Sequence, residues 1–348
     1  MKIGKRIDDG SDFELNLPVF LKTHTLIQGM TGSGKTNLIL KIVEESEKEK
    51  LDVQMIFLDD QEEFTEIPKH FKSFTMLSKD TPKSFTVAVQ KINNEDVCIA
   101  RLVGKQVRLL GKSVVVNLHD FTNKADRKKF VGEFLIGLES VGKQIGKHAL
   151  VVIDEADQYV PSKEKLHSIA TEPIIDLTKR ARKQNISMVL STQFMTEVDI
   201  RARRECHNRI LGNVTELRDS RGCAEMLGDM DLKNEFFDLD TGEFFVRGKI
   251  FPKGVSRIQV DRSTITVKQA GIDMEDVKSI SNSSELDNAI ERNNDLTKEE
   301  YLQMKVSFLE RQLEDQKKLT EEAFISGYEE CDKKWQNKST TERKITNE

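Results

Sequence analysis

The eight residues Gly29–Thr36 constrain the fold of this chain more than any other feature. They read G-M-T-G-S-G-K-T, the G-x-x-x-x-G-K-[ST] pattern of a phosphate-binding loop. Glycines allow a tight turn whose backbone N–H groups point at phosphate oxygens, and a helix that starts at Lys35 adds the positive end of its dipole. Such a loop needs a strand before it and a helix after it. The apolar run Thr25–Gln28 and the amphipathic stretch Lys35–Lys48 supply them.

Each residue of this loop has an expected part in binding ATP. Lys35 is expected to reach the β- and γ-phosphates as a point charge, and the Thr36 hydroxyl to complete the shell of a Mg²⁺ ion. The other loop residues are expected to surround the phosphates: Gly29, Met30, Thr31, Gly32, Ser33 and Gly34. The expected cofactors are therefore ATP and Mg²⁺.

A second apolar strand ends in two acids. The run Ala149–Ile153 is followed directly by Asp154 and Glu155. Asp154 is expected to hold Mg²⁺ through water, and Glu155 suits a general base that orients the attacking water. A surface acid pair is the alternative, but the apolar run before these carboxylates favours a buried strand. Because binding alone needs no general base, the pair predicts hydrolysis.

A third strand, Met188–Ser191, ends in Thr192 and Gln193. A polar residue at the end of a strand beside the loop strand can contact the γ-phosphate or the attacking water. The pair is also an ordinary way for a strand to end, so by itself it is a weak signal.

Short apolar runs alternate with longer amphipathic stretches over residues 1–270. Further strands are expected at Gln54–Leu58 and Val114–Leu118, and helices at Lys124–Ile145 and Leu166–Lys183. This alternation predicts an α/β domain with a mostly parallel sheet and helices on both faces. Short extended segments with Gly/Asp turns are expected near its end: Glu243–Val246, Gly254–Val260 and Thr264–Val267.

The composition changes after residue 270. Residues 271–288 are expected to form a linker, 289–336 an acidic helical extension, and 337–348 a disordered tail. A short heptad pattern is formed by Leu302, Val306, Leu309 and Leu313. It predicts either a short coiled coil that assembles copies of the chain or one amphipathic helix packed on its own domain.

The charge distribution excludes a generally basic nucleic-acid binder. The net charge is −5, and residues 271–348 carry 19 acidic against 12 basic side chains. Lys179–Arg209 instead holds eight basic residues against three acidic ones. This cluster predicts contact with a phosphate-rich partner, or else a solvated helix face.

Other sequence features suggest an intracellular protein. No apolar stretch approaches the ~20 residues that a membrane span needs, and the N-terminus has no apolar core of a secretory signal. The four cysteines lie far apart without metal-ligand spacing, so reduced thiols and a cytoplasmic location are expected.

With these elements in order, the chain resembles the HerA/FtsK group of P-loop motor ATPases, and HerA-like proteins most closely. The resemblance covers about Lys2 to Val267. It rests on the stretches HTLIQGMTGSGKTNLI (24–39), IFLDDQEEF (56–64), VVVNLHDF (114–121), VVIDEADQYVP (151–161), RARKQNISMVLSTQ (180–193) and IRARRECHNRILGNVTELRDS (200–220). Glu62 stands where the family usually has glycine, and Phe194 departs from the family's usual Arg-Pro.

The resemblance implies a RecA-like fold and a ring, expected to be a hexamer, with ATP sites between subunits. By motif position Gln193 would be the sensor, and Arg182 the arginine finger that enters the neighbouring site. Arg180 is the competing candidate for the arginine finger. The remaining alternative is that the residue at this position is an ordinary surface arginine. HerA-like motors usually carry a small β-barrel before the ATPase core. Only Met1–His24 precedes the loop strand here, so this barrel is expected to be absent.

Three functions fit these expectations. The first is an ATP-driven double-stranded DNA translocase ring. The second is a genome-packaging or conjugative DNA pump of a virus or mobile element, which the sequence does not separate from the first. The third is a nucleotide-gated ring that scaffolds an effector, such as a defence nuclease, with the C-terminal helix as its docking arm.

Overall fold

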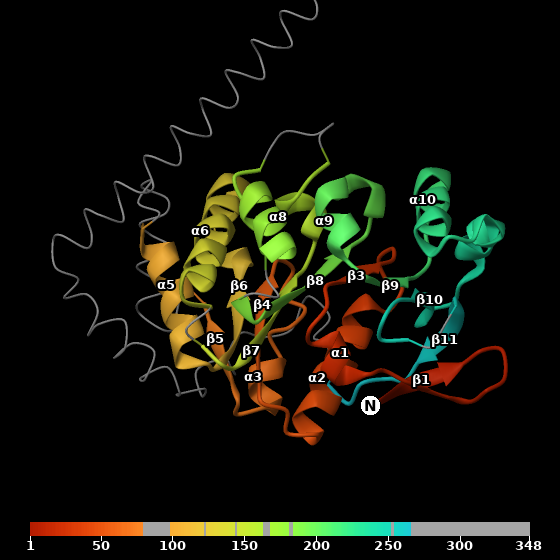
Figure 1. The fold of residues 1–348 in the computed structure, drawn as a ribbon, viewed down its shortest axis with the longest axis horizontal. Coiled ribbons are helices and arrows are strands. Elements are labelled where there is room, and N and C mark those ends of the chain that lie inside the picture. Colours follow the sequence, from red (N-terminus) through yellow and green to blue (C-terminus); the bar gives the residue numbers. More distant parts are fainter. Residues whose placement is uncertain are drawn as a thin grey trace, which may run out of the picture. The chain divides into compact units, whose positions relative to one another are not determined.

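Most strands of the sheet are short apolar runs in the sequence. A computed structural model describes residues 1–78, 98–121, 123–142, 145–162, 168–180, 184–251 and 254–265. Within them, eleven strands form one sheet (Figure 1). Their order is β2 (Asp12–Glu14), β1 (Lys2–Arg6), β11 (Ser256–Val260), β10 (Glu243–Arg247), β9 (Asn208–Leu211), β3 (Thr25–Gln28), β8 (Ile186–Thr192), β7 (His148–Ile153), β4 (Val53–Asp59), β6 (Ser113–Asn117) and β5 (Phe74–Leu77).

The sheet has a parallel part and an antiparallel part. The strands from β9 to β5 run parallel, whereas β10, β11, β1 and β2 each run antiparallel to their neighbours. Every residue of β3, β4, β6 and β8 is buried. This is typical of parallel strands, because helices cover them on both faces.

Helices lie on both faces of the sheet, as Figure 1 shows. One face carries α1 (Leu17–Phe20), α2 (Lys35–Lys48) and α3 (Ile67–His70). The other carries α6 (Lys124–Gly142), α8 (Thr171–Arg180), α9 (Ile200–Glu205) and α10 (Leu217–Leu227), with α5 (Cys98–Leu110) packed against α6. The short helix α7 (Ala156–Tyr159) and the 3-10 helices Leu118–Asp120, Met195–Glu197 and Met230–Asp238 complete the described elements.

Alternate residues of each central strand enter opposite cores. In β7, Leu150 and Val152 join the large apolar cluster that also contains Ile42 of α2. Val151 and Ile153 are fully buried outside that cluster. Because side chains alternate along a strand, Val151 and Ile153 face the helices on the side of the sheet opposite to α2. The sheet therefore has an apolar core on each face, between its strands and the helices that cover that face.

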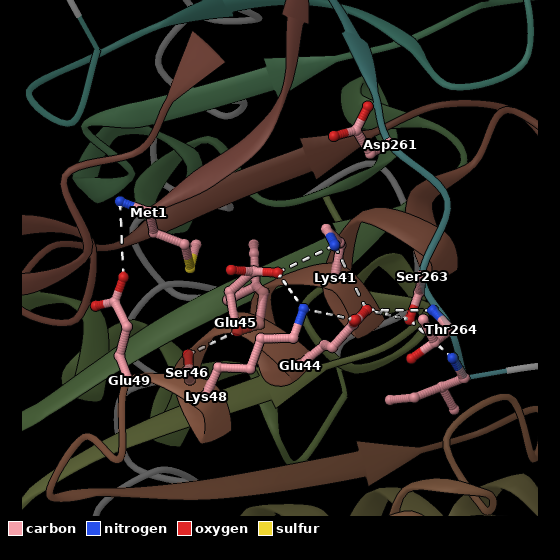
Figure 2. A network of polar contacts seen from close by, with 12 residues as sticks. Met1, Lys41, Glu44, Glu45, Ser46, Lys48, Glu49, Asp261, Ser263 and Thr264 are labelled. Atoms are coloured by element: carbon pink, nitrogen blue, oxygen red, sulfur yellow. Dashed lines mark hydrogen bonds and ion pairs between the residues drawn. The ribbon is translucent and has the colours of Figure 1, made fainter. Parts of the chain in front are cut away.

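The last described segment runs along α2 (Figure 2). Glu44, 4% exposed at its side chain, forms ion pairs with Lys41 and Lys48. It also accepts hydrogen bonds from the Ser263 hydroxyl at 3.3 Å and the Thr264 amide at 3.2 Å. Burial acts to raise the pKa of Glu44, but the hydrogen bonds from Lys48 and Thr264 and the charges of both lysines lower it to about 2. This segment is therefore fixed to the helix that follows the glycine-rich loop.

The predicted α/β fold with a mostly parallel sheet is confirmed, with differences at element ends. Leu118 belongs to a 3-10 helix rather than to β6, and the helix that starts at Lys124 ends at Gly142. Strands β1, β2, β5 and β9 were not predicted. All described residues fall within the first of the two units into which the chain divides, Met1–Asn293.

Several predictions lie outside the described residues. They are Arg182, the linker 271–288, the helical extension 289–336 and the tail 337–348. None of the helices that the structure describes is both long and apolar enough to span a bilayer.

Candidate ATP-binding and catalytic site

The glycine-rich loop connects β3 to α2, as its pattern predicts. Gly32 and Gly34 have φ values of +81° and +99°, in the left-handed region that side chains disfavour. A Cβ on Gly34 would also lie 3.0 Å from the backbone of Gly242. Glycine is needed at position 34 both for the turn and for this close approach.

Lys35 is folded into the loop that precedes it. Its Nζ donates hydrogen bonds to the carbonyl oxygens of Gly29 at 2.6 Å and Met30 at 3.3 Å. The ammonium group therefore lies within the loop that is predicted to hold the phosphates.

The two predicted halves of the site meet at one edge of the sheet. Strand β8 lies between β3 and β7, and all three are parallel. In register, Gln28 pairs with Thr192, and Ile153 pairs with Leu190. The loop after β3 and the acids Asp154 and Glu155 after β7 therefore leave the same edge, one strand apart.

Gln193 bridges the loop and Glu155, the predicted general base. The Thr31 hydroxyl donates to its Oε1 at 3.1 Å, and its Nε2 donates to Glu155 Oε1 at 2.7 Å. The amide of Gln61 donates to the same Glu155 oxygen at 2.8 Å. One carboxylate oxygen of Glu155 is thus held by two side-chain amides, one of which also contacts the phosphate-binding loop.

Carboxylates gather where the two halves meet. Asp154 is 3% exposed, and burial raises its pKa well above the usual value. The charges of Glu63, Asp59 and Glu155 raise it further, while Lys35 lowers it. Burial also raises the pKa of Glu155, against the hydrogen bond from Gln193. A divalent cation at this edge would relieve the repulsion between these acids.

The sequence analysis missed Glu63. Its carboxylate accepts a hydrogen bond from the Thr36 hydroxyl, the group expected to contact Mg²⁺. Its backbone amide donates to Asp59 Oδ1 at 3.1 Å, which fixes the turn after β4. The signal was present in the acidic turn of IFLDDQEEF, because parallel strands end at the same edge of a sheet.

Glu62 keeps a backbone conformation that suits glycine. Its φ is +61°, so the turn has left-handed geometry although a side chain is present. Asn117 at the end of β6 donates to its carboxylate at 2.9 Å. The departure from the family pattern therefore does not prevent this turn.

The residues present fit a magnesium ion held jointly with nucleotide phosphates. Thr36 and Asp154 offer the oxygen ligands that Mg²⁺ prefers. Among the described residues, no group of three or more His, Cys, Asp or Glu side chains could hold a metal ion. An ion here would therefore depend on phosphate oxygens and water, as in other P-loop sites.

Within the basic stretch 179–209, the described arginines differ in how far their charges are compensated. Arg201 forms ion pairs with Asp199 and Glu172, so its charge is compensated. Arg180 ends α8 with its side chain 64% exposed and its guanidinium 4.0 Å from Asp176. The finger role of Arg182 or Arg180 stays a prediction.

Residues 1–201 match the family described as Helicase HerA, central domain. The chain belongs to this HerA family. The resemblance to HerA/FtsK-type motors and the prediction of an ATPase are thereby confirmed. No curated protein sequence matches this chain.

The chain is also similar in fold to several solved structures. VirB4 of Thermoanaerobacter pseudethanolicus is 12% identical, with a TM-score of 0.53 over 76% of this chain and 96% of VirB4. The bacterial conjugative coupling protein TrwB is 9% identical, with a TM-score of 0.50 over 71% of this chain and 86% of TrwB. The genome-packaging NTPase B204 of Sulfolobus turreted icosahedral virus 2 is 15% identical, with a TM-score of 0.46 over 70% of this chain and 99% of B204. The RecA-like fold of this HerA-family chain is thereby confirmed.

Proposed function

We propose that this HerA-family ATPase hydrolyses ATP to move along double-stranded DNA. One observation carries the proposal: Gln193 contacts both Thr31 of the phosphate-binding loop and Glu155 across β8. This arrangement couples the position of the catalytic acid to the occupancy of the loop. Such coupling is what a motor needs, because hydrolysis must change the contacts that hold the nucleotide.

Binding residues position the triphosphate. Backbone N–H groups of the loop and the Lys35 ammonium bind its oxygens, and the Gly29 and Met30 carbonyls release Lys35 to do so. Thr36 and Asp154 would hold Mg²⁺, which supplies positive charge at the β- and γ-phosphates.

Glu155 orients and deprotonates the attacking water. The water oxygen forms a bond to the γ-phosphorus as the bond to the β-γ bridging oxygen breaks, and the proton passes to the Glu155 carboxylate. The amides of Gln61 and Gln193 fix that carboxylate. Burial raises the pKa of Glu155, and this makes it a stronger base than an exposed glutamate.

The proposed assembly is a hexameric ring with ATP sites between subunits. The HerA family supports it, and an arginine finger from the neighbouring subunit would supply the cation that phosphoryl transfer needs. Arg182 is the proposed finger, with Arg180 as its competitor.

The test is ATPase activity of the full chain with and without duplex and single-stranded DNA. We expect duplex DNA to stimulate hydrolysis, with a steep loss of stimulation as salt rises. Lys35→Ala controls for contaminating ATPases. Hydrolysis that is indifferent to DNA would overturn the translocase proposal and favour the nucleotide-gated scaffold.

A second assay separates the scaffold from the motor. If residues 285–348 are a docking arm, their deletion should remove a bound partner and leave DNA-stimulated hydrolysis intact. Loss of the assembly itself would instead show that these residues form the oligomer contact.

A further inference from the structure

A strongly basic pocket lies between the end of α9 and the turn after β10. Its volume is about 430 Å³, within the range of pockets that hold small ligands. It is lined by Arg204, His207, Arg209, Arg247, Lys249 and Phe251, together with two glycines. Two distant segments of the sequence thus place four cationic side chains around one cavity, and among the described residues no acid lines it.

The pocket lies away from the ATP site. Strand β9 is parallel to β3, and Asn208 at its start pairs with Thr25 at the start of β3. Arg209 pairs with Arg247, the last residue of β10. These arginines therefore lie near the amino-terminal edge of the parallel strands, whereas the phosphate-binding loop follows their carboxyl-terminal edge.

The cations of this pocket are not compensated. Among the described residues, Arg204, Arg209, Arg247 and Lys249 form no ion pair. By contrast, Arg257 on the neighbouring strand β11 is paired with an acid of β10 at 2.6 Å.

Arg209 is the most constrained of these cations. Its guanidinium donates to the Met226 carbonyl, while its buried Nε has no hydrogen-bond partner within the part of the chain that the structure describes. Burial and the nearby charge of Arg247 lower the pKa of Arg209. The fold therefore brings like charges together, and this raises the electrostatic free energy of the folded chain. An anionic ligand would lower that free energy again.

Guanidinium groups match phosphate oxygens in shape and charge, since their N–H groups donate in pairs. Several cations around one cavity suit neighbouring phosphates better than a single carboxylate. We propose that this pocket binds closely spaced phosphate groups, supplied either by a nucleic-acid backbone or by a small polyphosphate. The binding is independent of nucleotide at the glycine-rich loop and does not rest on the proposed motor function.

The test uses charge reversal at two of the exposed pocket cations, Arg204→Glu with Lys249→Glu. The matched control is Lys5→Glu with Lys72→Glu, which makes the same charge change at exposed sites elsewhere. All variants are full-length chains that also carry Lys35→Ala, so that the ATP site does not contribute. The probes are a fluorescein-labelled duplex, the matching single strand, and inorganic tripolyphosphate measured by calorimetry.

We expect the pocket variant to bind its ligand about tenfold or more weakly, and the salt slope of DNA binding to fall by about 2. The control pair should bind like the parent. Arg204→Lys with Lys249→Arg should retain binding, which shows that the charge reversal did not act by unfolding the chain.

The outcomes separate the two phosphate sources. Loss of DNA binding alone identifies a nucleic-acid backbone, and loss of tripolyphosphate binding alone identifies a small ligand. The proposal is overturned if the pocket variant binds every probe like the parent, or if the control pair loses as much affinity. Because Lys35-intact protein is assayed separately for DNA-stimulated hydrolysis, failure of the motor proposal leaves this result unaffected.

Discussion

At the scale of single residues, Glu155 is held by two amides that set where its carboxylate points. Replacing it with glutamine keeps the size of the side chain and removes the base. We expect Glu155→Gln to bind ATP normally and to hydrolyse it about 10²–10⁴-fold more slowly. Nucleotide binding by fluorescence and single-turnover hydrolysis measure the two effects separately.

Glu62→Gln is the matched control for that variant. It removes one negative charge from the same sheet edge, at a side chain that contacts Asn117 instead of Gln193. Near-normal turnover is expected for it. If Glu155→Gln hydrolyses ATP at the same rate as this control, the assignment of the base is wrong.

Asp59 predicts a specific pH dependence of stability. Burial raises its pKa to about 7, although the amides of Phe64 and Glu63 donate to it. Between about pH 4 and pH 7 the folded chain keeps a proton that the unfolded chain has lost. The free energy of unfolding should therefore fall as pH rises through this window, by up to ~1.4 kcal/mol per pH unit for this group.

Urea unfolding across this pH window measures the effect. Asp59→Asn removes the titrating group, so its stability should fall less steeply with rising pH than that of the wild type. Parallel pH profiles for the two proteins would contradict the burial of a protonated Asp59.

The residues of the loop could be predicted from sequence because Gly29–Thr36 is a local pattern with a local cause. The acidic turn after β4 was a signal for this edge of the sheet, but the contacts of Gln61 with Glu155 and of Glu63 with Thr36 could not be assigned from sequence, because they depend on the order of the strands. Neighbouring strands in the parallel part of this sheet are distant in sequence, and spacing alone does not state their order.

At the scale of elements, α2 begins at the phosphate-binding loop and contacts the last described segment along its side. Figure 2 shows this segment beside the helix. Asn37 on this helix donates to the Asp261 carbonyl at 3.0 Å and accepts from the Ser263 amide at 2.9 Å. With the contacts of Glu44, these bonds hold one segment along two turns of the helix. The segment from Asp261 to Thr264 is therefore fixed to the helix that follows the glycine-rich loop.

Glu44→Gln tests how much this attachment stabilises the fold. The lowered pKa of Glu44 contributes stability that is present above about pH 4.5 and is lost as pH falls through about 2. At neutral pH the variant should lower the free energy of unfolding by about 1–3 kcal/mol, and its stability should fall less at acid pH.

Glu49→Gln is the control at the C-cap of the same helix. Its side chain is 44% exposed and lies 3.8 Å from the N-terminal amine, so a loss below about 1 kcal/mol is expected. Equal losses in chemical denaturation for the two variants would show that the Glu44 contacts add nothing specific.

The central strands could be predicted because β4, β6, β7 and β8 are continuous apolar runs buried on both faces. β1 and β2 mix exposed and buried positions over a few residues, and β9 begins with the polar pair Asn208–Arg209. Their pairing in the sheet, rather than local composition, makes them strands.

At the scale of the whole molecule, the proposed ring makes each ATP site depend on two subunits. Arg182→Ala should leave ATP binding intact and reduce turnover strongly, because the finger acts only in the transition state. Lys35→Ala should abolish productive binding. A mixture of the two variants should recover some activity, since some interfaces then combine an intact loop with an intact finger.

ATPase assays across mixing ratios measure this recovery, with native mass spectrometry to follow mixed assembly. Arg180→Ala is assayed alongside because Arg180 is the competing finger candidate; if Arg182 is the finger, Arg180→Ala should keep near-normal turnover. If the mixture forms rings and regains no activity, Arg182 does not act in the neighbouring site.

We propose that ATP hydrolysis at the site formed by the glycine-rich loop and the Asp154–Glu155 pair moves this protein along duplex DNA. Displacement of a labelled third strand from a DNA triplex measures that movement directly. We predict ATP-dependent displacement by the wild type and none by Glu155→Gln. Hydrolysis by the wild type without displacement, or equal displacement by Glu155→Gln, would contradict the claim.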